Sequence, residues 1–363
     1  MSELLVIGGG LSGGAAALLL ARMGKSVRLI ERTAAPKDKI CGEFLSIAAQ
    51  DHLRALGIDL DAMGAVRVDR IRVVGGRSVE TPLPFTARGI SRKRLDEALL
   101  KLAEASGATV ERGVRASEIR AREVTTSDGD RHADAILLAT GKLDVRTTQR
   151  AGDMPRDAHV GFKMHWRVDA PAAALLDGVI ELVLFPGGYA GLQMVESGVA
   201  NLCLVVRRGR LRAFGGQWQD VLASLAGRSR ALDAVIGSQP LFARPLTIAN
   251  LAYGRLPRDT TGEDSYRLGD QAAMTASLTG DGMAIALRSA WLAARCLQAG
   301  EPAARYHERI GAMVTQQVRR GMILQHMADM PLLRQVGLGL LSWRPALLRS
   351  ITQLTRLPAV AME

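Results

Sequence analysis

Residues 4–17 are Leu-Leu-Val-Ile-Gly-Gly-Gly-Leu-Ser-Gly-Gly-Ala-Ala-Ala, an apolar run followed at once by closely spaced glycines. The apolar run predicts a short buried strand, and Gly8, Gly10 and Gly13 have the G-x-G-x-x-G spacing of a dinucleotide-binding turn. Gly8 permits the tight turn, Gly10 lets the backbone approach a pyrophosphate, and Gly13 lets the next helix pack close to the strand. That helix, expected over residues 11–23, points its N-terminal N–H groups at the phosphates.

A second strand and an acidic residue complete this pattern. Gly24 ends the predicted helix, residues 26–31 are expected to form the second strand, and Glu31 lies 18 residues after Gly13. A carboxylate at this distance accepts hydrogen bonds from a ribose hydroxyl in dinucleotide-binding folds. Strand, glycines, helix and acid occur in register within 31 residues, which favours a dinucleotide site over a turn that binds nothing.

The composition is that of a globular protein, with 363 residues that are 48% hydrophobic and 23% charged, enough for two domains. The net charge of +11 favours anionic partners, but only 4% of the residues are aromatic and the basic residues are spread along the chain, so nucleic-acid binding is not expected. The three cysteines are widely spaced and the six histidines form no ligand cluster, so neither disulfides nor a metal site is predicted. This cysteine usage, together with the absence of a signal peptide or a long apolar run, predicts a cytoplasmic protein.

The order of the predicted elements places one domain inside another. Strand and helix patterns alternate up to residue 141, tight turns join strands between 159 and 206, and the parallel-strand pattern returns near residue 265. We therefore predict an α/β fold: a Rossmann-like cofactor domain with an inserted antiparallel β-sheet substrate domain and C-terminal helices. The cofactor domain is expected to comprise residues 1–75, 88–158 and 255–300, the substrate domain residues 76–87 and 159–254, and the C-terminal helical segment residues 301–363.

A loop after the second strand is a candidate edge of the active site. Cys41, Gly42 and Glu43 place a thiol, a flexible backbone position and a carboxylate in a row beside the expected dinucleotide site. The alternative is an ordinary surface loop in which Cys41 packs inward, because free cysteine is among the most buried residue types. The residues themselves leave both interpretations open.

Several motifs together resemble the flavoprotein superfamily of p-hydroxybenzoate hydroxylase and the geranylgeranyl reductases, over residues 1 to about 300. The motifs are the glycine turn with Glu31, the R-x-x-L-D-x-x-L helix that begins at Arg92, Gly269-Asp270 with Leu278-Thr279-Gly280-Asp281-Gly282, and Gly187-Gly188-Tyr189 with Asn201. In addition, Cys41-Gly42 is similar to a Cys-Gly-Gly motif of the reductases, with Glu43 in place of the second glycine.

The resemblance implies that the cofactor is FAD and that NAD(P)H or a separate reductase donates the electrons. It places Asp270 at a ribityl hydroxyl and brings the turn at Gly280 and Gly282 to the N1–C2=O edge of the flavin, where a helix N-terminus stabilises negative charge. The residues expected to bind the cofactor are Gly8, Gly10, Gly13, Glu31, Arg32, Cys41, Gly42, Arg92, Gly141, Asp270, Gly280, Gly282 and Met283.

Two stretches depart from the superfamily pattern. The hydroxylases carry Asp-Gly after the buried strand that ends here at Gly141, whereas this chain has Lys142, which offers a phosphate a positive charge instead. The reductases line a prenyl channel with aromatic residues after their Gly-Tyr. Here Tyr189, Gly191 and Gln193 share one face of the strand and leave an open space with one amide.

The sequence and the resemblance together predict an FAD-dependent oxidoreductase, most simply a monooxygenase that acts through a flavin hydroperoxide on a small apolar or aromatic molecule. The candidate catalytic residues are Cys41, Glu43, Tyr189 and Gln193, with proton transfer assigned to Tyr189 or Glu43. Two alternatives stay open: a reductase of isoprenoid-type C=C bonds, and a flavin-binding sensor or electron carrier without turnover.

The C-terminal segment has an amphipathic pattern with regularly placed arginines between residues 331 and 354. This pattern is typical of a core helix or a lid over a pocket, and also of a helix that lies on a membrane surface. The expected partners are therefore a lipophilic small molecule and, as an alternative to packing, a weak membrane-surface contact. The sequence does not fix the oligomeric state.

Overall fold

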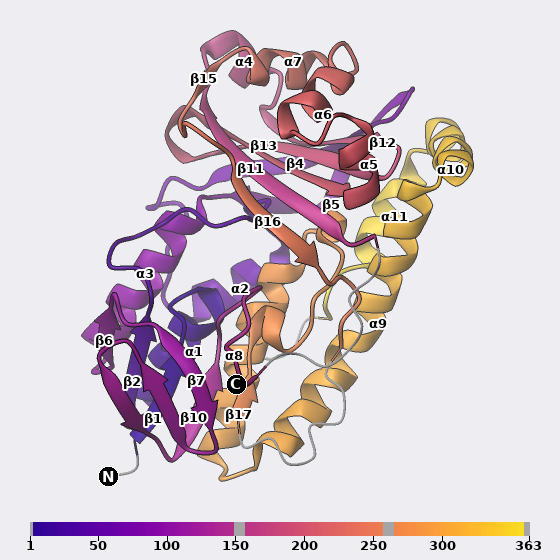
Figure 1. Cartoon of the computed structure of the whole chain (residues 1–363). Coiled ribbons are helices and arrows are strands. Elements are labelled where there is room, and N and C mark those ends of the chain that lie inside the picture. The colour runs from indigo at the N-terminus through magenta and orange to yellow at the C-terminus, as the bar shows by residue number, and fades with distance from the viewer. Residues whose placement is uncertain (1–2, 149–156, 257–264, 359–363) are drawn as a thin grey trace.

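The computed structural model describes residues 3–148, 157–256 and 265–358, which form two main sheets with helices between and beside them (Figure 1). The first sheet has five parallel strands in the order β17-β10-β1-β2-β6. They are β1 (Glu3–Ile7), β2 (Ser26–Glu31), β6 (Thr109–Arg112), β10 (Ala135–Leu138) and β17 (Ser265–Arg267). The central strand β1 is almost entirely buried, as expected when helices cover both faces of a parallel sheet.

The second sheet has nine strands and is mainly antiparallel. Its order is β15-β11-β14-β13-β12-β4-β5-β3, with β16 paired to β11 outside this path, and its one parallel pair is β4 with β12. The strands are β3 (Phe44–Leu45), β4 (Val66–Val74), β5 (Ser78–Gly89), β11 (His159–Arg167), β12 (Gly178–Phe185), β13 (Gly188–Val195), β14 (Val199–Arg207), β15 (Gln239–Pro240) and β16 (Leu246–Leu251). The predicted fold class is confirmed.

The structure differs from the predicted domain boundary at residue 75. β4 hydrogen-bonds to β5 and β12 and not to the parallel sheet, so residues 66–74 belong to the nine-stranded sheet. Buried and exposed positions alternate in the first half of β5, a pattern typical of an antiparallel strand with one solvated face. The segments 149–156 and 257–264, near other predicted boundaries, lie outside the described residues.

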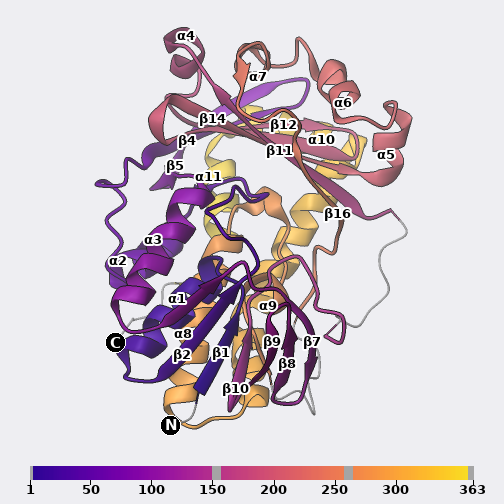
Figure 2. The ribbon, with the colours of Figure 1, turned by 60° about the vertical axis from the view of Figure 1, so that its left-hand side comes forward.

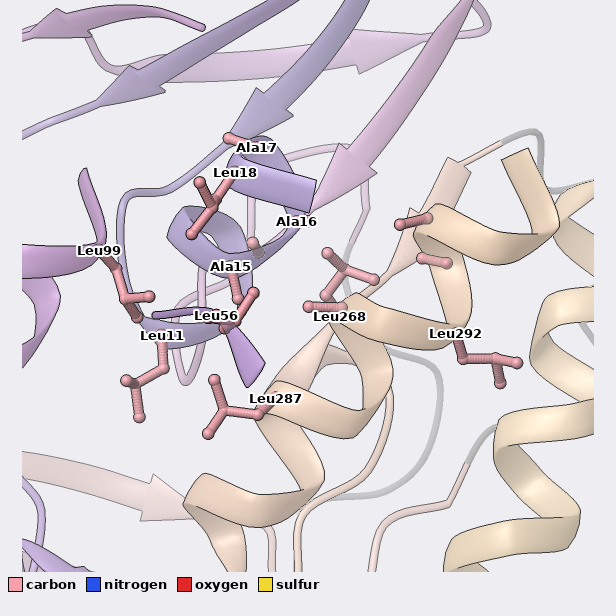
Figure 3. Packing of buried hydrophobic residues seen from close by; sticks show 14 of the residues in the cluster. Leu11, Ala15, Ala16, Ala17, Leu18, Leu56, Leu99, Leu268, Leu287 and Leu292 are labelled. Atoms are coloured by element: carbon pink, nitrogen blue, oxygen red, sulfur yellow. The ribbon is translucent and has the colours of Figure 1, made fainter. Parts of the chain in front are cut away.

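Three helices meet beside the parallel sheet, in the half of the molecule that is expected to bind the cofactor. α1 (Leu11–Arg22) packs on β1 and β2 and lies between α3 (Arg92–Ala105) and α8 (Gly282–Gln298). Ala15 and Ala16 are fully buried, and their small side chains let α1 approach its neighbours closely. Figure 3 shows leucines from all three helices packed around this alanine face.

The shorter elements complete the two halves. A third sheet of β7 (Ala116–Arg120), β8 (Glu123–Thr126) and β9 (Gly129–His132) lies beside the parallel sheet (Figure 2). The short helices are α2 (Ile47–Ala55), α4 (Ala170–Ala174), α5 (Arg208–Ala213), α6 (Trp218–Leu225) and α7 (Arg230–Ile236). Gly215 and Gly216, with φ values of 119° and 91°, separate α5 from α6.

Three C-terminal helices join the two halves. α9 (Ala303–Asp329) packs on α8 and β17 at one end and reaches β12, and both α10 (Pro331–Trp343) and α11 (Ala346–Leu354) contact β5 (Figure 1). Pro331 begins α10 and fixes the turn from α9, because proline suits the first position of a helix and cannot continue one. No helix within the described ranges is long and apolar enough to cross a bilayer.

The close approach of α1 to the first turn gives a stability prediction. An ideal Cβ at residue 13 would lie 1.8 Å from the carbonyl oxygen of Gly8. We therefore expect Gly13→Ala to lower the free energy of unfolding by about 3 kcal/mol, as at overpacked sites, in urea denaturation. Gly339→Ala is the matched control, since no atom lies within 4 Å of a Cβ there and alanine favours the helix. Equal stability of the two variants would contradict the close packing.

Candidate active site

A cavity of about 1040 Å³ lies between the parallel sheet, the nine-stranded sheet and the C-terminal helices. The first glycine turn forms one end of it, and aliphatic side chains form the other. Of the residues predicted from the sequence, Gly13 alone does not line this cavity, because it packs on Gly8. The predicted residues that do line it are Gly8, Gly10, Glu31, Arg32, Cys41, Gly42, Glu43, Arg92, Gly141, Tyr189, Gln193, Asp270, Gly280, Gly282 and Met283.

Two cations stand beside the first glycine turn. The Arg92 guanidinium binds the Asp96 carboxylate through two hydrogen bonds of 2.9 and 3.0 Å, and the Lys39 ammonium lies 2.9 Å from the same carboxylate. Burial lowers the pKa of Arg92, but the charges and hydrogen bonds of Asp96 and Cys41 together raise the pKa above its ordinary value. A Cβ at Gly10 would lie within 3.5 Å of both cations. Fixed positive charge at a helix N-terminus suits a pyrophosphate.

Glu31 is held at the end of β2 by backbone donors. Its Oε2 accepts a hydrogen bond from the Gly9 N–H at 2.7 Å, and its Oε1 accepts one from the Thr33 N–H at 3.0 Å. Burial raises the pKa of this carboxyl, but Lys39 and the two N–H groups hold it below its usual value. Glu31 is therefore an ionised acceptor on the cavity wall, as a ribose contact requires.

The second part of the cofactor wall comes from late in the sequence. Asp270 lies 2.9 Å from the Lys142 ammonium, which stands where the hydroxylases have an aspartate. Burial lowers the pKa of Lys142, but Asp270 and Cys41 together raise it above its ordinary value, so the lysine stays charged. On the wall of the same cavity, a Cβ at Gly282 would meet open space. The first turn of α8 therefore presents bare backbone to the cavity.

Glu43 has a backbone φ of 59°, in the left-handed region that favours glycine. This is the position at which the reductase motif has its second glycine. The carboxylate is fully buried, and its Oε1 binds the Lys163 ammonium and the Arg92 N–H, while its Oε2 lies 2.7 Å from His165 Nε2. Burial raises the pKa of Glu43, but Lys163 and His165 hold it below its usual value. Because both oxygens are engaged, the geometry favours a positioning role over the proton transfer predicted for Glu43.

Amides from the nine-stranded sheet hold the loop before Glu43. Asn201 Nδ2 donates to the carbonyl oxygens of Gly42 at 2.9 Å and Cys41 at 3.1 Å, and Gln193 Nε2 donates to Gly42 at 3.1 Å. Cys41 Sγ accepts a hydrogen bond from the Glu43 N–H at 3.4 Å. Gln193, predicted as a catalytic group, thus acts here on the backbone of the loop.

A polar cluster lies in the aliphatic part of the cavity. The Tyr189 and Tyr253 hydroxyls both hydrogen-bond to Ser277 Oγ. Burial raises the pKa of both phenols above the ordinary value, so both remain protonated at neutral pH. Burial also raises the pKa of the nearby Cys203 thiol to about 12, which leaves it a neutral, unreactive thiol.

The sequence analysis did not single out four residues of this site: Lys163, His165, Tyr253 and Ser277. Lys163 and His165 lie two positions apart on β11, a strand with eight of its nine residues buried. A basic side chain in such a strand needs a buried acidic partner, so this pattern was an available signal. The partner lies 120 residues earlier, and no local spacing identifies it.

Known proteins resemble this chain in sequence and in fold. A family model for the FAD binding domain matches residues 1–136. Menaquinone reductase of Mycolicibacterium smegmatis is 24% identical over 318 residues, which cover 82% of this chain and 77% of that protein. The chain is therefore similar to FAD-dependent oxidoreductases, and its first 136 residues match an FAD binding domain. The resemblance to this flavoprotein superfamily predicted from the sequence motifs is therefore confirmed.

Solved flavoprotein structures share the fold. A probable FAD-dependent monooxygenase from Pseudomonas aeruginosa, PqsL, matches with a TM-score of 0.70 at 17% identity, over 92% of this chain and 98% of that one. A geranylgeranyl bacteriochlorophyll reductase-like protein from Thermoplasma acidophilum matches with a TM-score of 0.72 at 18% identity, over 91% and 88%. At these identities the likeness shows the fold of the flavoprotein and leaves its reaction to be argued from the site.

The residues of the cavity fit FAD. Glycine backbone at Gly10, Gly42 and Gly282 faces the cavity, and a Cβ at Gly42 or Gly282 would meet open space. Arg92 and Lys142 supply positive charge on the same wall. The first glycine turn therefore fits a pyrophosphate, and the region between Gly42 and the N-terminus of α8 has room for a flavin.

The buried Glu43–Lys163 pair gives a second stability prediction. Glu43→Gln leaves the Lys163 ammonium buried without its counter-charge, which costs about 3–5 kcal/mol. The double variant Glu43→Gln/Lys163→Met removes both charges, so we expect it to regain more than half of that loss in urea denaturation. If the double variant loses the sum of the two single-variant losses, the charges are not coupled.

The same pair predicts a pH effect. The folded pKa of Glu43 lies below the ordinary value of 4.5. Its stabilising contribution is therefore fully present above about pH 4.5 and is lost as the pH falls further. The Glu43→Gln variant should lose less stability than the wild type over this acidic range.

Proposed function

We propose that this flavoprotein is a monooxygenase that inserts oxygen into a lipophilic molecule with a polar head group and a long apolar tail. The supporting observation is that one cavity extends from the first glycine turn into an aliphatic chamber between the nine-stranded sheet and the C-terminal helices. The chamber wall includes Ile71, Val73, Leu182, Leu184, Leu338 and Leu348. Such a wall stabilises a bound apolar tail by about 25 cal/mol for each Å² removed from water.

The tyrosine pair supplies the polar end of the chamber. Tyr189 and Tyr253 share Ser277 as a hydrogen-bond partner and both stay protonated. Each phenol can therefore donate a hydrogen bond to an oxygen of the head group or hold a proton there. This arrangement orients the head toward the flavin region and leaves the tail among the aliphatic side chains.

Bound FAD would supply the redox chemistry, including the activation of molecular oxygen. The chain binds the substrate, orients its head group and excludes water from the reaction. Where the hydroxylases have an aspartate, this chain has Lys142, which pairs with Asp270. Because of this difference, the electron donor has to be identified separately from the substrate. We keep NAD(P)H and a separate reductase protein as the two candidates.

Reduction of an isoprenoid-type C=C bond is the second candidate function. It is favoured by the relative named menaquinone reductase and by the Cys41-Gly42 motif. For this reaction bound FAD would supply the hydride for one carbon, and Tyr189 is the candidate proton donor to the other. A sensor or carrier without turnover is less well supported, because Leu340 and Leu347 on the chamber wall are 50% and 42% exposed and the chamber is therefore not sealed.

An anaerobic titration with NADPH and NADH tests the donor and prepares the test of the reaction. Loss of flavin absorbance with either nucleotide identifies it as a donor. No loss, with normal reduction by dithionite, indicates a separate reductase protein. The reduced protein is then exposed to a long-chain alkylphenol or to menaquinone, with and without oxygen. A product that gains one oxygen atom supports the monooxygenase, a gain of two hydrogen atoms supports the reductase, and flavin reoxidation that no probe changes favours the carrier.

Tyr189→Phe tests the role of the polar cluster. We expect turnover to fall about a hundredfold, within the range for loss of a proton-transfer group, while the affinity for FAD stays unchanged. Tyr266→Phe is the matched control, because its hydroxyl donates to the Glu301 carbonyl oxygen and not to a group in the chamber. Equal turnover of the two variants would remove Tyr189 from the mechanism.

A further inference from the structure

Helix α10 carries a stripe of large apolar side chains that no other element of the described chain covers. Leu332, Val336, Leu340 and Trp343 are 71%, 53%, 50% and 74% exposed. Their spacing of three or four residues places them on one face of the helix. On α11, Leu347 and Leu354 are also 42% and 55% exposed. We call these six residues the apolar patch.

The apolar patch coincides with the mouth of the chamber. Leu340, Leu347 and Leu354 are exposed to solvent and also line the cavity. Buried neighbours on the same two helices, Leu338 and Leu348, continue this wall inward. The chamber therefore reaches the surface between α10 and α11, and a molecule that enters there passes from the apolar patch into the aliphatic chamber.

The segment that carries the apolar patch has charged residues of one sign. Residues 330–358 contain four arginines and no aspartate or glutamate. Arg344 and Arg349 are exposed, and the Arg344 guanidinium lies 4.8 Å from the centre of the Trp343 ring. Exposed apolar side chains with an interfacial tryptophan and flanking arginines are typical of a helix that lies in the surface of a bilayer.

A second copy of the chain fits the apolar patch less well than a bilayer does. In a twofold symmetric contact the same patch meets itself, so Arg344 and Arg349 would approach the same arginines of the other copy without an acidic partner in this segment. Like charges across an interface are unfavourable. A bilayer with anionic head groups provides both an apolar interior and the missing negative charge.

We propose that α10 and α11 dock this flavoprotein on the surface of a bilayer that contains anionic lipids, with the mouth of the chamber toward the lipid. The delivery of a lipophilic substrate by this route rests on the proposed function, whereas the docking itself does not. A docked mouth lets an apolar tail move from lipid to chamber without crossing water.

Vesicle sedimentation without any substrate tests the docking. The full chain is mixed with vesicles of phosphatidylcholine alone or of phosphatidylcholine with phosphatidylglycerol. We expect binding to the second kind, weakened by salt because the charge attraction is screened. A wild-type chain that stays in the supernatant with both kinds of vesicle overturns the proposal.

Two sets of variants separate the apolar and the charged contributions. Leu332→Ser/Val336→Ser/Trp343→Ser changes exposed residues outside the cavity wall, and we expect it to weaken vesicle binding about tenfold or more. Leu241→Ser, at a residue 37% exposed next to β15, is its control. Arg344→Gln/Arg349→Gln should weaken binding to anionic vesicles about 25-fold, at about fivefold for each arginine. Its control of equal charge is Arg54→Gln/Arg120→Gln, on exposed side chains of α2 and β7.

The outcomes distinguish the occupants and the two proposals. Vesicle binding that the apolar triple variant leaves unchanged overturns the docking surface, and so does a wild-type dimer that this variant converts to a monomer. Vesicle binding without turnover of any probe contradicts the proposed function alone. Turnover of a detergent-dispersed probe without vesicle binding contradicts the docking alone.

Discussion

The ion pair between Glu43 and Lys163 links the loop beside the first glycine turn to the nine-stranded sheet. Both side chains are fully buried, so neither charge has water to replace its partner. Glu43 follows the loop that closes the cofactor site, and Lys163 belongs to β11 in the nine-stranded sheet. Together with the hydrogen bonds from Asn201 and Gln193 to the loop backbone, this contact fixes the position of the loop relative to the sheet.

Glu43 departs from the reductase pattern, and its contacts explain how a residue other than glycine is tolerated there. The reductase motif has glycine where this chain has Glu43, and the backbone there is left-handed. A side chain at such a position adds strain, which the bonds to Lys163, His165 and the Arg92 N–H offset. The loop is thus fixed by charge in this chain, whereas a glycine fits the same backbone conformation without strain.

Local patterns in the sequence predicted the cofactor half well, because its signals are short in range. The strand at 4–7, the glycine turn and Glu31 occur within one supersecondary unit and need no information from elsewhere. The assignment of β4 failed because a strand is placed by its hydrogen-bonding partners, and β12 lies about 110 residues later. Lys163 was missed for the same reason: its partner is fixed by the packing of two sheets and not by any spacing along the chain.

The parallel sheet is completed by β17, and the FAD wall by Asp270 and the first turn of α8, all beyond residue 264. A ribosome that has synthesised the first glycine turn has therefore made only half of a binding site. During translation, more than 250 further residues must be synthesised before the second part of this wall is present. The complete cofactor wall of this protein consequently forms only late in the synthesis of the chain, when the segment beyond residue 264 can pack against the early strands.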